Sequence, residues 1–202
     1  GEKECARLSA VLSKMEFPGG RVRDKELTAE QATAIRREAH AAGKPSMALA
    51  QAIAFDLGVR PKDVIGEWLP ASEPGMSDVL DGTDKWLWGI RWSEIDASLK
   101  LKHVTSKRQK EIEIDLRLAD MVLAELKLIH DFDPARDDRS KLPMSGPIIK
   151  EARTGRPYHD DQFRAQGRKL ARAVGIPDHV RNQDSRAGAI SEATDAGAML
   201  ED

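Results

Sequence analysis

The sequence holds little of the residue types on which several protein classes depend. Its 202 residues include one cysteine, Cys5, so the chain forms neither an internal disulfide nor a cysteine-rich zinc site, and a reducing, cytoplasmic location is expected. No apolar run approaches the length of a membrane-spanning helix, and residues 1–15 lack the apolar stretch of a secretory signal. The sequence therefore predicts a globular protein that makes no contact with a membrane.

Metal-binding patterns and a strong net charge are absent as well. His103, His159 and His179 are scattered without the spacing of metal ligands, so neither a metal nor another cofactor is expected. The formal net charge is -2, which gives no support to nucleic-acid binding by the molecule as a whole. Between residues 150 and 186, however, nine Lys or Arg outnumber five acids. Such a run is ordinarily a solvated helix face, so any nucleic-acid site must be local.

Hydrophobic periodicity predicts a mainly α fold with a small antiparallel β-sheet, the α+β class. Apolar spacing, caps and breakers indicate helices over residues 4–15, 28–43, 46–57, 118–129, 160–174 and from 184 onward. Thr28 and Gln31 form a capping-box pattern, and Ser46 is expected to cap the next helix. Residues 69–85 are rich in turn formers and predict a loop, while residues 147–150 are a short strand candidate.

Two segments in the middle of the chain alternate apolar and charged residues. Residues 98–104 and 111–116 both have the period of half-buried strands, and the polar residues between them predict a hairpin loop. If the hairpin forms, one face of it is expected to carry a shared set of side chains: Leu99, Leu101, His103, Ile112 and Ile114. The sequence therefore predicts an antiparallel pair with one buried face.

Three separated pieces of the sequence resemble the catalytic domain of tyrosine recombinases, the phage-integrase family. The pieces are VRPKDVI, then IRWSEIDASLKLKHVTSKRQKEIEIDL, and finally GRPYHDDQFRAQGRKLARAVGIP followed by NQDSRAGAISEATDAGA. Their order and spacing also match, from about Leu27 to the end. The resemblance implies a catalytic domain over residues 25–202, with residues 1–24 as the end of a preceding helical DNA-clamping domain and its linker.

The resemblance also implies roles for individual residues. Arg60 takes the place of the family's first active-site arginine, Lys107 that of the hairpin lysine, and Arg186 that of the second arginine, with Asp63 as an acid that supports Arg60. Two guanidiniums can hold the non-bridging oxygens of a phosphodiester under attack. A lysine can protonate the departing 5′-oxygen. This chemistry needs no metal.

Two departures from the family pattern bear on activity. The position that usually holds histidine is Gln183, which can donate a hydrogen bond but cannot move a proton near neutral pH. The family's nucleophilic tyrosine follows the second arginine, and no tyrosine follows Arg186 here. The sole tyrosine, Tyr158, lies upstream at a position where the family commonly has a structural residue. We therefore expect a C-terminally incomplete catalytic domain that does not cut DNA alone.

The expected partners are double-stranded DNA and, in the full-length protein, further copies of the chain assembled on that DNA. Additional phosphate contacts are expected from Arg108, Lys110, Arg164 and Arg168. Other interpretations stay open. Arg60 could pair with Asp56 or Asp63 and Arg186 with Asp184 or Glu192. Residues 48–69 also scan as a helix-turn-helix, and a degenerate recombinase relative could bind DNA without cutting it.

Overall fold

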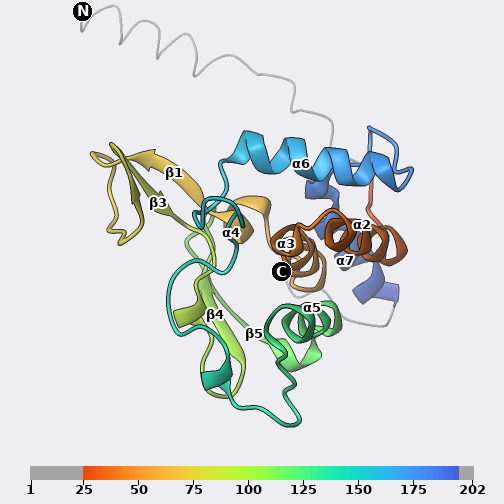
Figure 1. Cartoon of the computed structure of the whole chain (residues 1–202), viewed down its shortest axis with the longest axis horizontal. Helices are drawn as coiled ribbons and strands as arrows, with labels where there is room; N and C mark the ends of the chain where they lie inside the picture. Colours follow the sequence, from red (N-terminus) through yellow and green to blue (C-terminus); the bar gives the residue numbers. More distant parts are fainter. Residues whose placement is uncertain (1–24, 196–202) are drawn as a thin grey trace, which may run out of the picture.

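The computed structural model describes residues 25–195 (Figure 1). They form a mainly α domain, as predicted, with two small antiparallel sheets where one was expected. A helix expected over residues 4–15 lies outside the described residues. The α-helices are α2 (Ala29–Ala41), α3 (Pro45–Asp56), α4 (Pro61–Ile65), α5 (Asp120–His130), α6 (Asp160–Ala173) and α7 (Ser185–Asp195). Short 3-10 turns are η1 (Trp92–Glu94), η2 (Leu116–Leu118), η3 (Arg139–Lys141) and η4 (Asn182–Asp184).

Helix α3 is the centre of the helical part. Its residues 47–55 are all buried, because all but Gln51 have small or apolar side chains and helices α2, α5 and α7 pack around them. Thr28 caps α2 in the predicted capping box with Gln31. The predicted cap at Ser46 is wrong: α3 begins at Pro45, and the Ser46 hydroxyl instead lies 2.9 Å from the Tyr158 hydroxyl.

The predicted hairpin is confirmed. Strand β4 (Lys100–Val104) pairs antiparallel with β5 (Glu111–Asp115), and the registered pairs on the inner face are Leu101 with Ile114 and His103 with Ile112. Leu101 and His103 are buried, whereas their neighbours Lys102 and Val104 are exposed. The period-two pattern therefore placed the correct side chains on the core face.

The expected loop at residues 69–85 is only partly right: residues 71–79 are turns and loop, but both ends of the segment belong to a three-stranded sheet. Its strands are β1 (Glu67–Pro70), β2 (Leu80–Asp81) and β3 (Asp84–Leu87), in the order β1-β3-β2. The indole of Trp86 is buried and donates to the carbonyl of Ile65 at 2.7 Å. The ammonium of Lys85 donates to three loop carbonyls, those of Ala71, Glu73 and Gly75. These non-local contacts order a segment that is rich in turn residues.

The remaining elements agree with the sequence except near residue 147. The strand expected at 147–150 is reduced to one isolated bridge between Arg91 and Pro147. Helices α5 and α6 lie within one or two residues of their predicted bounds, and α7 is described as far as Asp195. Within residues 25–195, no helix has both the length and the apolar character that crossing a membrane requires.

Candidate active site

Arg60 stands at the joint between α3 and α4. Gly58, with a φ of +56°, turns the chain after α3, and Pro61 then begins α4 with Arg60 at its N-cap. Asp56 and Asp63 have other partners: Asp56 accepts two amides at the start of α5, and Asp63 accepts the amide of Ser106. No ion pair of the half-buried Arg60 side chain is found with residues 25–195. The guanidinium is therefore available to a ligand.

Arg186 approaches the same joint from the first turn of α7. Its Nη1 donates to the carbonyl of Gly58 at 2.7 Å. Burial lowers the pKa of Arg186, and repulsion from Arg60 lowers it further. Both side chains line one open depression on the surface together with Lys25 and Gln183. The structure thus brings together two predicted arginines and the predicted glutamine, which are far apart in the sequence.

Close packing fixes η4 and α7, which carry Gln183 and Arg186. Gln51 on α3 donates to the hydroxyl of Ser185 at 2.9 Å, and both side chains are buried. Gly188 lies so near the carbonyl of Leu27 that a Cβ there would be 2.0 Å from the oxygen. Since real Cβ atoms do not approach an oxygen so closely, only glycine permits this contact.

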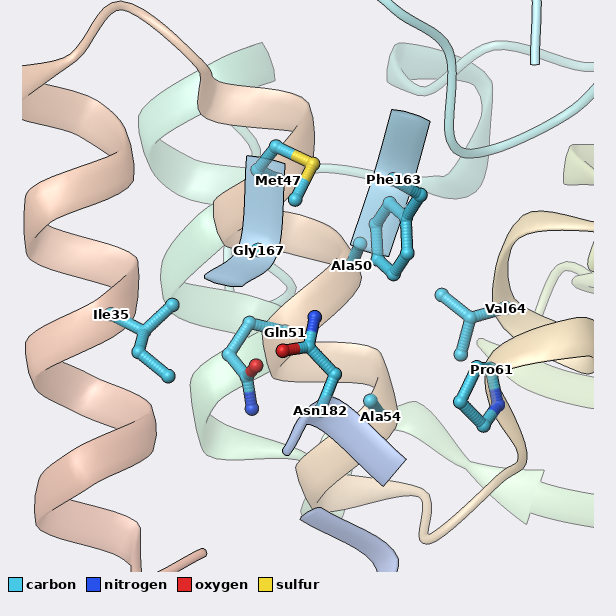
Figure 2. A pocket seen from close by; sticks show the side chains of 10 residues that line it. All are labelled: Ile35, Met47, Ala50, Gln51, Ala54, Pro61, Val64, Phe163, Gly167 and Asn182. Atoms are coloured by element: carbon cyan, nitrogen blue, oxygen red, sulfur yellow. The ribbon is translucent and has the colours of Figure 1, made fainter. Parts of the chain in front are cut away.

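A second glycine contact holds η4 against α6. Figure 2 shows Asn182 between α3 and α6, near Gly167, where a Cβ would lie 2.3 Å from the Asn182 amide nitrogen. The space among these side chains is only about 10 Å³, which is at most the room for one water molecule. This pocket is therefore a packing joint between helices, and it fixes Asn182 of η4, the turn that directly precedes α7.

The hairpin loop between β4 and β5 contacts α4, the helix that has Arg60 at its N-cap. Lys107, Arg108 and Lys110 are exposed on this loop. The Ser106 amide donates to Asp63 Oδ1 at 2.7 Å, which joins the loop to α4, and Arg108 is close enough to contribute to the lowered pKa of Arg186. Asp63 was expected to support Arg60, but its carboxylate accepts the Ser106 amide of the hairpin loop, so it supports the segment that carries Lys107.

A basic cleft of about 500 Å³ adjoins the depression and shares Pro61 and Gln183 with it. Arg164 on this cleft is 69% exposed and pairs with Asp160. Arg168 was expected to contact DNA, but its guanidinium donates to the carbonyls of residues 176, 177 and 180 and so holds the loop after α6. A DNA contact by Arg168 stays a prediction, and the exposed Arg164 is better placed for it.

Three comparisons relate this geometry to known proteins. The chain matches a lambda integrase tetramer bound to a Holliday junction with a TM-score of 0.58 and 16% identity, over 96% of this chain and 52% of that one. It matches the lambda integrase catalytic core with a TM-score of 0.54 and 17% identity, over 85% and 84%. It matches XerA recombinase with a TM-score of 0.53 and 13% identity, over 91% and 54%. The chain has the fold of a tyrosine-recombinase catalytic core.

The likeness lies in the fold and not in the overall sequence. Family models and curated proteins give no match to the sequence. The chain spans about half the length of the integrase chains in two of the DNA-bound structures that it resembles. On this recombinase-core fold, Arg60, Gln183 and Arg186 form the depression described above, with Lys107 on the neighbouring hairpin loop.

Tyr158 is buried in this recombinase-core fold. Its side chain is 2% exposed, its hydroxyl lies against Ser46, and its ring packs edge-on against Phe163. Burial raises the pKa of Tyr158, which keeps the phenol protonated. A residue that attacks DNA must reach the surface, so the position of Tyr158 agrees with the expected structural role.

The helix-turn-helix interpretation of residues 48–69 is wrong. A recognition helix needs an exposed face to enter a groove, whereas α4 has five residues, of which Asp63, Val64 and Ile65 are buried. The chain then passes directly into β1. Sequence reasoning also missed Lys25 and Lys62, which line the depression, and Arg181, which lines the basic cleft. The sequence signal that could have identified the first two is their position: Lys25 shortly precedes α2 and Lys62 lies in the first turn of α4.

Proposed function

We propose that this chain is the phosphate-binding core of a DNA-breaking and rejoining enzyme, a tyrosine-type site-specific recombinase or integrase. The observation that supports the proposal is the convergence of Arg60, Gln183 and Arg186 on one surface depression of a recombinase-core fold. Double-stranded DNA is the proposed substrate, and several copies of the full-length protein would assemble on it, as in the integrase dimers and tetramer of similar fold. A cytoplasmic location stays a prediction.

The proposed chemistry assigns one task to each side chain. Arg60 and Arg186 donate to the non-bridging oxygens of the scissile phosphate, where negative charge builds in the transition state. Lys107 protonates the departing 5′-oxygen from the mobile end of an exposed side chain. Gln183 donates a hydrogen bond and transfers no proton. Asp63 positions the loop that carries Lys107 through its bond to the Ser106 amide.

The attacking tyrosine of this reaction would come from outside the 202 residues. Within them, the sole tyrosine is Tyr158, whose hydroxyl is enclosed by the core. Phosphate-binding groups without a nucleophile hold a phosphodiester but leave it intact. We therefore expect the isolated chain to bind duplex DNA and not to cleave it.

DNA binding is tested by fluorescence anisotropy with a labelled duplex between about 50 and 200 mM salt. The Arg60→Ala/Arg186→Ala variant is expected to bind more weakly and to lower the slope of log affinity against log salt by about 2, since two phosphate contacts are lost. The matched control is Arg117→Ala/Arg136→Ala, which removes the same charge from exposed residues paired with Asp115 and Asp137. Equal weakening in the two variants would contradict the proposed site.

Cleavage is tested with a nicked suicide duplex and a denaturing gel. The isolated chain is expected to form no covalent adduct. An adduct that disappears in Tyr158→Phe would overturn the placement of the nucleophile outside these residues. A relative that binds DNA without cutting is the second candidate, and Gln183 at the usual histidine position favours it. A protein extended beyond Asp202 that carries a tyrosine and still forms no adduct would support this second candidate.

A further inference from the structure

A buried ionic cluster joins β4, α4 and η1 and takes no direct part in the proposed chemistry. His103 on β4 is 2% exposed and Asp63 on α4 is 1% exposed. The Nδ1 atom of His103 lies 3.2 Å from both carboxylate oxygens of Glu94 on η1. Its Nε2 atom lies 3.8 Å from Asp63 Oδ1, which is beyond hydrogen-bond distance but within ion-pair distance. One imidazole thus stands between two carboxylates from different elements.

Two atoms of this cluster have no hydrogen-bond partner within the described residues. They are Nε2 of His103 and Oδ2 of Asp63, and both are buried. A buried carboxylate without a countercharge is costly, so a cation beside it is required. Among residues 25–195, Asp63 and Glu94 are the ion-pair partners of His103, and the residue opposite it on β5 is the apolar Ile112. The geometry therefore favours an imidazolium.

The protonation energetics agree with this geometry. Burial by itself would lower the pKa of His103, but attraction to Asp63 and Glu94 outweighs burial and raises the pKa to about 9. For Asp63, burial alone would raise the pKa, yet His103 and the Ser106 bonds lower it to about 2. At neutral pH the cluster therefore holds a cation between two anions.

The cluster is connected directly to the hairpin loop. Asp63 Oδ1, the oxygen that faces His103, also accepts the Ser106 amide at 2.7 Å. Ser106 precedes Lys107, and Asp63 lies three residues after Arg60 in the same helix turn. A displacement of the Asp63 carboxylate would therefore move the loop that carries Lys107 relative to Arg60.

We propose that His103 is a positioning residue: as a buried cation it holds the Asp63 carboxylate at the Ser106 amide and thereby sets the place of the loop that carries Lys107. The link from His103 to the hairpin loop depends only on the contacts above. The consequence of that link for DNA binding and cleavage rests on the proposed function. Within residues 25–195, neither Arg60 nor Lys107 contacts His103. The effect of His103 on the hairpin loop must therefore pass through Asp63.

The first test uses nuclear magnetic resonance on the unaltered chain. The His103 ring is expected to titrate well above 6.5, and the Ser106 amide proton, shifted downfield by its carboxylate acceptor, is expected to move with the same midpoint. His130 is the internal reference, since burial without a carboxylate partner lowers its pKa. A neutral His103 at pH 7, or a Ser106 amide that does not respond to its titration, would overturn the proposal.

The second test uses His103→Gln, with His130→Gln as the matched control. The Ser106 downfield shift is expected to be lost in His103→Gln and retained in His130→Gln. DNA affinity gives the second readout: His103→Gln is expected to weaken binding in the unaltered background but not further in Lys107→Ala, because it acts through that loop. Additive effects of the two substitutions would contradict the proposal.

Two further outcomes keep this proposal separate from the proposed function. If neither the unaltered chain nor any variant binds DNA, the proposed function fails, while the Ser106 response to His103 still decides the positioning role. If His103→Gln does not fold, His103→Leu, which fills the same space without charge, replaces it. Retention of the Ser106 shift in His103→Leu would overturn the proposal, and loss of the shift would support it.

Discussion

Gly188→Ala tests whether the close contact of α7 with the start of α2 sets the position of Arg186. The added Cβ would lie 2.0 Å from the carbonyl oxygen of Leu27 and 3.3 Å from the ring of Phe55. The first neighbour is backbone and cannot rotate away. Contacts of a Cβ below 3.0 Å do not persist, so α7 must move away from Leu27 by at least about 1 Å. Arg186, two residues earlier, would move with it.

Two opposing effects determine the stability change in Gly188→Ala. Alanine is better than glycine inside a helix by about 1 kcal/mol. Overpacking a filled site costs typically 1–3 kcal/mol, and the upper part of that range applies here because the clash is with backbone. The net expectation is a loss of about 1–2 kcal/mol. Without the clash, the same substitution would stabilise the protein.

The assay combines urea unfolding with the anisotropy measurement of duplex DNA binding. Gly188→Ala is expected to lower both stability and DNA affinity, since the displaced guanidinium of Arg186 no longer lies beside Arg60. Ala193→Gly is the matched control, because it costs up to about 1 kcal/mol of helix propensity at an exposed position of the same helix. It should leave DNA affinity unchanged. A Gly188→Ala protein with unchanged or increased stability and normal DNA binding would refute the reasoning.

Two further predictions concern buried charges away from the depression. Glu125 is 1% exposed and pairs with Arg36 at 2.8 Å. Glu125→Gln is therefore expected to lower the free energy of unfolding, measured with urea, by about 3 kcal/mol. The control Glu111→Gln, at an exposed position, is expected to show no comparable loss. Lys85→Met removes the ammonium that binds three loop carbonyls and is expected to make residues 71–75 sensitive to limited proteolysis, with DNA affinity unchanged. If residues 71–75 of Lys85→Met resist the protease as well as those of the unaltered chain, this role of Lys85 is contradicted.

The elements that local sequence predicts best are those whose contacts are local. The capping box at Thr28 needs only Gln31, three residues later, and the β4-β5 hairpin needs only alternation and a polar turn. The three-stranded sheet was missed for the opposite reason. Its strands have two to four residues, and it is held by contacts such as the Trp86 indole on the carbonyl of Ile65, twenty-one residues away. Such a contact leaves no periodic pattern of apolar residues in the sequence.

The candidate site was likewise predictable only in part. Resemblance to a family predicted Arg60, Lys107 and Arg186, but the residues alone gave no reason to bring them together. Arg168 illustrates what pattern cannot decide: a basic residue on a basic helix was expected to face DNA, yet three carbonyls of the next loop take its donors. His103 illustrates the converse: it has no metal-ligand spacing in the sequence, yet its buried imidazole lies between the carboxylates of Asp63 and Glu94.

The pH dependence of stability follows from that cluster. Because the pKa of His103 is raised to about 9, its contribution is fully present below about 6.5, where the unfolded chain also binds the proton, and is lost as the pH rises through 9. Asp63 acts in the opposite range, since its pKa is lowered to about 2 and its contribution is lost as the pH falls from about 4 toward 2.

The magnitude of the His103 contribution decides between two mechanisms of alkaline destabilisation. One unit of pKa corresponds to about 1.4 kcal/mol, so the rise from 6.5 to about 9 corresponds to at most about 3.5 kcal/mol. Exposed lysines also lose charge at high pH, but surface ion pairs contribute about 0–1 kcal/mol each. A loss of stability as the pH rises from about 6.5 through 9 that disappears in His103→Gln must therefore come from the buried cluster, whereas a loss that survives the substitution belongs to the surface.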